Sequence, residues 1–161
     1  MRALTLHRPW PWAILHLDPP KAKRIENRIW APPTSVIGEV IALHAGSGFE
    51  LQAAEYIRHA SSHWPPGASE HPTGIVGVAR VIGYCDPRPP GARARLHGPD
   101  LAEAAHVMTA SAHWYMGSFG WLLGDVVALP TPIPCAGSRR LWTVPDGVEV
   151  AVNNALARRE P

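Results

Sequence analysis

The beginning of the chain reads LTLHRPWPWA over residues 4–13 and KAKRIENRIW over residues 21–30. Its apolar content predicts a strand over residues 3–7. The prolines that follow suit the first turn of a short helix over residues 10–17, because amides there have no intrahelical partner to lose. An Asp-Pro-Pro sequence ends that helix, and residues 24–30 then read as an extended segment. The opening therefore predicts a strand, a short helix and a second extended segment, in that order.

Strand patterns dominate the rest of the chain, and the expected helices are short. Gly77 and Gly83 interrupt one strand and indicate a bulge or a close approach of another backbone. Asp146, with Glu149 three residues on, predicts a capping box at the start of the last helix. The expected elements are strands over residues 38–45, 74–84, 118–128 and 141–144, a short edge segment over 132–135, helices over 49–64, 101–107 and 146–157, and a long surface loop over 86–100. This mixed order predicts an α+β fold with a small β-barrel and short flanking helices.

The composition describes one ordinary domain of 161 residues. Hydrophobic residues make up 46% and charged residues 17%, which provides for a core and excludes disorder by composition. No apolar run approaches the ~18 residues of a membrane helix, and the first residues lack the pattern of a signal peptide. Two cysteines, Cys85 and Cys135, allow at most one bridge. We therefore expect a cytoplasmic protein with no membrane partner.

The cations are nearly all arginine. Of the 15 Lys and Arg residues only Lys21 and Lys23 are lysine, and the net charge is +2. So small a charge does not indicate a nonspecific coat for nucleic acid, although arginine forks suit phosphates and base edges. A GC-rich genome produces the same bias, and we give that explanation more weight. Seven Trp beside two Phe are less ordinary, because an indole ring is also a platform on which a base can stack.

Several uncommon residues follow one another in a characteristic order along the chain. They are Lys23, Glu26 and Arg28, then Gly38, His44 and Ala45, and later GSFGW over residues 117–121 and Leu141-Trp142. In this order, over residues 2–145, the chain resembles the ASCH domain of the PUA-like superfamily. The resemblance implies an ASCH domain over residues 1–145, followed by a C-terminal helix and tail over 146–161.

The resemblance also implies a fold and two activities. The expected fold is a small, partly open PUA-like β-barrel with helices at its rim and a cleft that holds Lys23 and Glu26. ASCH domains are thought to act on RNA or nucleotides, and some resemble amidohydrolases that remove an acyl group from acylated cytidine with Lys, Thr and Glu. Here Glu26 stands where that Thr is expected, and the strand over 74–84 contains no carboxylate.

Lys23 and Glu26 are the first candidates for a site. In a regular strand they point to opposite faces, so they meet only if a turn or bulge intervenes. If they meet, Glu26 holds Lys23 charged while burial lowers the pKa of the lysine. Lys23 can then grip a phosphate, or serve as a base or nucleophile beside Glu26. The purely structural alternative is a ladder in which Arg24, Glu26 and Arg28 share one strand face.

Other residues are candidates for ligand binding. Asn27 has an amide that can bond the edge of a base, or that can instead satisfy backbone in a turn. His44 precedes a small glycine loop where a phosphate can approach backbone amides. The remaining candidates are Arg28 in the same cleft as Lys23 and Glu26, Trp12 and Trp30 as walls of a base pocket, Tyr115 in the loop over 113–117, and Arg139 and Arg140 as phosphate contacts. Trp10, Trp121 and Trp142 are expected in the core.

Other chemistries find little support. His59 and His63 stand four apart on an expected helix, but no carboxylate or thiol accompanies them at a zinc spacing, so no metal and no cofactor is expected. No nucleophile elbow or phosphate loop is present. The leading hypothesis is thus an RNA- or nucleotide-binding domain that recognises a modified base. The alternatives are a nucleoside amidohydrolase with Lys23 and Glu26 as catalytic residues, and a protein-interaction module.

Overall fold

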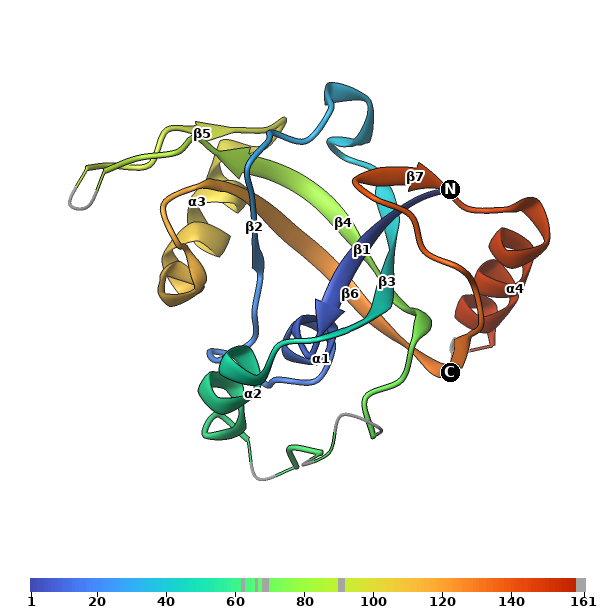
Figure 1. Cartoon of the computed structure of the whole chain (residues 1–161). Helices are drawn as coiled ribbons and strands as arrows, with labels where there is room; N and C mark the ends of the chain where they lie inside the picture. Colours follow the sequence, from blue (N-terminus) through green and yellow to red (C-terminus); the bar gives the residue numbers. More distant parts are fainter. Residues whose placement is uncertain (62, 66, 68–69, 90–91, 159–161) are drawn as a thin grey trace.

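The chain forms an α+β fold in a computed structural model that describes residues 1–61, 63–65, 67, 70–89 and 92–158 (Figure 1). The strands are β1 (Arg2–Arg8), β2 (Ile25–Arg28), β3 (Val40–Phe49), β4 (Gly74–Cys85), β5 (Leu96–His97), β6 (Phe119–Ile133) and β7 (Leu141–Thr143). The helices are α1 (Trp10–Leu15), α2 (Leu51–Arg58), α3 (Leu101–Ala110) and α4 (Asp146–Ala157). Among the described residues, none of these helices is long and apolar enough to cross a membrane.

The strands form one mixed sheet in the order β2-β6-β4-β3-β1-β7, with β5 added to β4. β1 and β3 pair in parallel, whereas every other pairing is antiparallel. Over the described residues the sheet is not closed, and β2 and β7 stand at the two ends of its path. The register between β4 and β6 shifts between Ile75 and Gly77 and again between Val81 and Gly83. The bulges expected at the two glycines are therefore confirmed.

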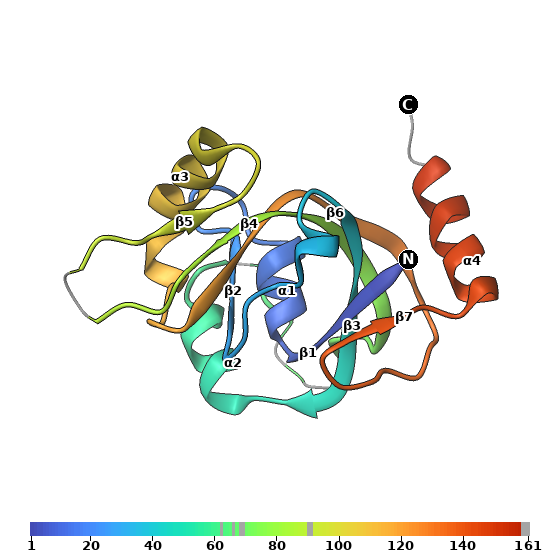
Figure 2. The same ribbon diagram turned by 90° about the horizontal axis from the view of Figure 1, so that it is seen from above.

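The core lies on both faces of β4, which is buried along nearly its whole length. One cluster packs α1, α2 and α3 against the sheet and includes Ile25 and Trp114. A second, with Leu4, Ile41 and Trp121, fills the space beneath β1, β3 and β6. Figure 2 shows α1 within the curve of the sheet between β2 and β3, α2 and α3 toward one side, and α4 standing apart from the other helices. The curved sheet and this packing bring β1, β2 and β3 to a common opening.

Three local expectations were wrong. The segment over 86–100 is not only loop, because Leu96 and His97 add β5 to the edge of β4. The last helix has no side-chain cap: Pro145 precedes it, and Glu149 instead forms an ion pair with the amino group of Met1. A tertiary partner thus replaces the local capping bond. The expected helix over 49–64 also ends early, at Arg58.

The two cysteines are both free, and they differ in burial. Burial raises the pKa of the Cys85 thiol, whose side chain is fully enclosed, so little reactive thiolate forms there. Cys135 is partly exposed. We expect iodoacetamide to alkylate the native protein at Cys135 alone, and at both cysteines in urea, as measured by peptide mass spectrometry. Rapid native labelling of Cys85 would contradict the packing of this core.

Candidate functional site

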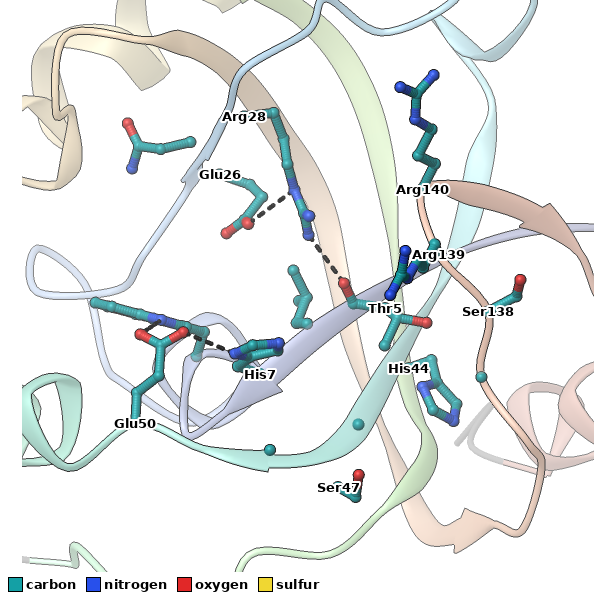
Figure 3. Close-up of a pocket in the computed structure, with 16 residues that line it drawn as sticks. Thr5, His7, Glu26, Arg28, His44, Ser47, Glu50, Ser138, Arg139 and Arg140 are labelled. Carbon is teal, nitrogen blue, oxygen red and sulfur yellow. Dashed lines mark hydrogen bonds and ion pairs between the residues drawn. The ribbon is translucent and has the colours of Figure 1, made fainter.

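A pocket of about 750 Å³ opens where β1, β2 and β3 meet the loop between β6 and β7 (Figure 3). Its wall comes from four segments that are far apart in the sequence. The lining residues are Thr5, Leu6, His7, Trp10, Glu26, Asn27, Arg28, His44, Gly46, Ser47, Gly48, Glu50, Gly137, Ser138, Arg139 and Arg140. The pocket therefore gathers carboxylates, imidazoles, hydroxyls and arginines into one concave surface.

Lys23 and Glu26 meet, because Lys23 precedes the first residue of β2 and does not follow the strand alternation. The Lys23 ammonium donates to the carbonyl of Ile25 at 2.7 Å and to Glu26 Oε2. Burial lowers the pKa of Lys23, and the charge of Glu26 opposes that effect. Only 2% of Lys23 is exposed, and it does not line the pocket. It lies behind Glu26, with its ammonium 5.4 Å from the centre of the Trp10 ring.

Glu26 is therefore the member of this pair that reaches the pocket. Its second oxygen, Oε1, lies 3.2 Å from Arg28 Nε. Arg28 also donates from Nη2 to the carbonyl of Thr5 at 3.0 Å, which links β2 to β1. Arg24 takes no part in an Arg-Glu-Arg ladder, because its guanidinium donates to the carbonyl of Ile14 at 2.5 Å. The Lys23 ammonium and the Arg28 guanidinium therefore hold the Glu26 carboxylate in place at the pocket wall.

A second carboxylate of the pocket, Glu50, is the residue that precedes α2. Its Oε1 lies 3.0 Å from Nδ1 of His7, and its Oε2 accepts from the Trp10 indole N–H at 2.8 Å. Trp10, expected in the core, packs against a core cluster and also lines the pocket. His7 and Glu50 were not identified from the sequence, because nothing near either residue indicates that 43 positions later the chain returns to the same place.

His44 and the loop before β7 form the other side of the pocket. The Nε2 atom of His44 lies 2.9 Å from the carbonyl of Cys135, so this nitrogen carries the hydrogen. Its Nδ1 is enclosed without a hydrogen-bond partner. The loop then passes close to the ring at Gly137 and presents Arg139 and Arg140 to the pocket. His44, Arg139 and Arg140, which the sequence indicated as candidate ligand contacts, therefore line the same pocket.

Asn27 touches the pocket, but its amide is already engaged. Its Nδ2 donates to the carbonyl of Trp114 at 2.7 Å, and its Oδ1 accepts from the amide of Met116 at 2.8 Å. This arrangement corresponds to the backbone-satisfying alternative for an asparagine. Asn27 holds the segment before β6 against β2.

Three aromatic candidates lie outside the pocket. Trp12 packs edge-on against Trp64 with ring centres 5.0 Å apart. Trp30 packs against Trp121 in the same manner at 4.8 Å. Tyr115 donates its hydroxyl to the carbonyl of Asp86 at 2.9 Å. All three have packing partners of their own, and the structure does not bring them to the residues of the pocket.

The histidines expected on one helix do not form a metal cluster. His59 lies just after the end of α2, so the helical spacing to His63 does not apply. His71 packs against Trp64, with ring centres 4.7 Å apart. Within the described ranges, no group of three or more His, Cys, Asp or Glu side chains is arranged to hold a metal ion.

A scan of the chain against protein-family models finds no match, and a search of curated proteins finds none either.

Proposed function

We propose that this chain is an ASCH domain that binds a nucleotide, free or within RNA, in the pocket between β1, β2 and β3. One observation carries the proposal. A single pocket combines an indole and two carboxylates on one side with two arginines and small polar residues on the other. A nucleotide has the matching division, since its base offers a π face and N–H donors while its phosphate offers anionic oxygens.

The side formed by the loop suits a phosphate. Arg139 and Arg140 come from this loop, and Ser47 lies across from it on β3. Guanidinium groups bind phosphate oxygens with paired, charge-assisted hydrogen bonds. Figure 3 draws Arg139, Ser138 and His44 on the same side of the pocket. We therefore assign the phosphate to this side.

The opposite side suits a base. The Trp10 ring is held by its N–H bond to Glu50, so it presents a fixed aromatic surface. Glu26 keeps acceptor capacity, because each carboxylate oxygen has two lone pairs and each here has one cationic partner. An ionised carboxylate accepts hydrogen bonds but does not donate them. We therefore expect a base that presents an amino or ring N–H group to Glu26.

The finer description of the fold belongs to the same proposal. We assign the sheet to the PUA-like class of partly open barrels. The support is the contact from Arg28 on β2 to the carbonyl of Thr5 on β1, which joins two strands that are four places apart in the sheet path. One side chain thus bridges β2 and β1, which are not neighbours in the sheet, and this supports the proposed partly open barrel.

The amidohydrolase alternative receives less support. It requires Lys23 to activate water or to attack the substrate, yet the Lys23 ammonium is buried behind Glu26 and does not line the pocket. Lys23 is better suited to positioning Glu26. Removal of an acyl group from N-acylated nucleosides that depended on Lys23, and not on the stability of the variant, would restore that alternative.

Calorimetric titration with nucleosides, their 5′-monophosphates and short RNAs tests the proposal. We expect the monophosphates to bind more tightly than the nucleosides, and the Arg139→Ala/Arg140→Ala variant to lose about tenfold or more in monophosphate affinity. The control is Arg93→Ala/Arg95→Ala, which removes the same two charges from the loop before β5, outside the pocket. Equal losses in both variants would indicate a general charge effect. No binding of any ligand in the panel would favour an interaction module.

A further inference from the structure

His7 and Glu50 have the geometry of an acid-base pair. His7 Nδ1 lies 3.0 Å from Glu50 Oε1. Because an ionised carboxylate only accepts, Nδ1 carries the hydrogen, and Nε2 of the neutral ring keeps its lone pair. The other oxygen of Glu50 is held by the indole of Trp10. A carboxylate that is itself fixed thus sets the orientation of an imidazole, which is the arrangement that activates a proton acceptor.

The imidazole is open to a ligand. The side chain of His7 is 64% exposed, although both residues line the pocket. Gly48 lies beside the ring, where a Cβ would approach three of its atoms to 3.5 Å. In Figure 3 the ring extends from Glu50 toward the part of the pocket lined by Thr5 and Arg139. His7 therefore lies between the side assigned to the base and the side assigned to the phosphate. In the proposed binding mode, the ribose of the nucleotide would occupy this position.

We propose that His7 and Glu50 make this pocket an esterase for carboxylic esters carried on the ribose hydroxyls of a nucleotide; the inference rests on the proposed function. His7 Nε2 takes a proton from water as the water oxygen bonds to the ester carbonyl carbon, and the π electrons move to the carbonyl oxygen. When this electron pair forms the C=O bond again, the bond from that carbon to the ribose oxygen breaks. The imidazolium gives its proton to the departing oxygen, and the products are the free nucleotide and a carboxylic acid.

Acyl transfer suits a single imidazole better than phosphoryl transfer. The same imidazole can take and return the proton at a tetrahedral carbon, because nucleophile and leaving group lie on one side. In-line displacement at phosphorus places the leaving group opposite, where a second acid is needed. The other imidazole of the pocket, His44, is bonded to Cys135 through Nε2, and its Nδ1 is enclosed. The arginines of the pocket favour the negative charge that develops on the carbonyl oxygen.

The test is hydrolysis of 2′(3′)-O-acetyl-AMP and 2′(3′)-O-acetyl-CMP, followed by chromatography and corrected for spontaneous hydrolysis. We expect His7→Ala to lower kcat by about 10²-fold or more and added imidazole to restore part of the rate. Glu50→Gln, a change in a positioning residue, is expected to lower kcat more than it changes KM. His97→Ala is the matched control, since it removes an imidazole 2.9 Å from Asp86 Oδ2 outside the pocket and is expected to retain full activity.

Parallel titrations with AMP and CMP separate the two proposals. If either nucleotide binds but its acetyl ester is not hydrolysed, the esterase inference is overturned and the binding function stands. The inference also fails if His7→Ala and His97→Ala are equally active, or if imidazole restores nothing to a folded His7→Ala variant that binds nucleotide. If neither nucleotide binds and neither ester is hydrolysed, the esterase inference fails, and the binding function falls with it only when the full panel of monophosphates and short RNAs also shows no binding.

Discussion

Replacing Lys23 by Met is expected to lower the free energy of unfolding by about 3–5 kcal/mol, because removing one partner of a buried ion pair leaves the other insufficiently compensated. Lys23 is 2% exposed and its ammonium bonds Glu26 and the carbonyl of Ile25. Methionine keeps most of the apolar stem but supplies no donor. Urea unfolding followed by tryptophan fluorescence measures the difference. Because this lysine is buried, Lys23→Ala is also expected to destabilise the fold.

Two further variants separate the ion pair from general effects of substitution. Lys21→Met changes the same residue type on the surface, where the ammonium donates to the carbonyl of Ala60, and is expected to alter stability by no more than about 0.5 kcal/mol. Lys23→Met/Glu26→Gln removes both charges and is expected to be more stable than Lys23→Met alone. A Lys23→Met variant as stable as Lys21→Met would show that the buried pair contributes nothing.

Replacing Gly137 by Ala is expected to displace the loop that carries Arg139 and Arg140. A Cβ at Gly137 would lie 2.4 Å from Cε1 and 2.6 Å from Nδ1 of His44, and 2.9 Å from Thr5 Oγ1. The His44 ring has little freedom to move, because it is bonded to Cys135 and packs edge-on against Trp142. The loop must therefore move away. We expect about 1–3 kcal/mol of destabilisation and at least about a tenfold loss in nucleotide affinity.

The design includes a control glycine and a compensating change. At Gly147 in α4 an added Cβ meets nothing within 4 Å, so Gly147→Ala is expected to leave affinity unchanged and to stabilise the helix by about 0.5–1 kcal/mol. His44→Ala removes the ring with which the new methyl collides, so its combination with Gly137→Ala should cost less stability than the sum of the single changes. Strict additivity would mean that the collision with His44 is not the cause.

Local patterns in the sequence were sufficient to predict most of the secondary structure. The apolar residues before Pro9 predict β1, and β-branched residues predict β3 and β4. These preferences can be read from the sequence because they depend on neighbours along the chain. The bulges of β4 were predictable for the same reason, since a glycine marks such a site by itself. Local pattern failed for the cap of α4, where Glu149 bonds the distant amino group of Met1.

The candidate site was only partly predictable. Lys23, Glu26 and Arg28 are close in sequence, but regular strand alternation would have kept Lys23 and Glu26 on opposite faces, so their meeting could be predicted only on the condition of a turn or bulge. That Lys23 lies behind Glu26 depends on Trp10 and on the turn before β2. Trp10 and Trp12 have nearly the same local surroundings, and only packing decides that one lines the pocket while the other packs against Trp64.

By itself the sequence determined the α+β class, the order along the chain of every strand but β5, and the polar residue types available for a site. Only the tertiary structure decided that Glu50 meets His7, and that Arg139 and Arg140 face Glu26 across one pocket. The physical reason is that secondary structure depends on side-chain periodicity and backbone preference within a few residues. A pocket formed by β1, β2, β3 and a loop 90 residues later depends instead on how the whole sheet curves and on which side chains fill its core.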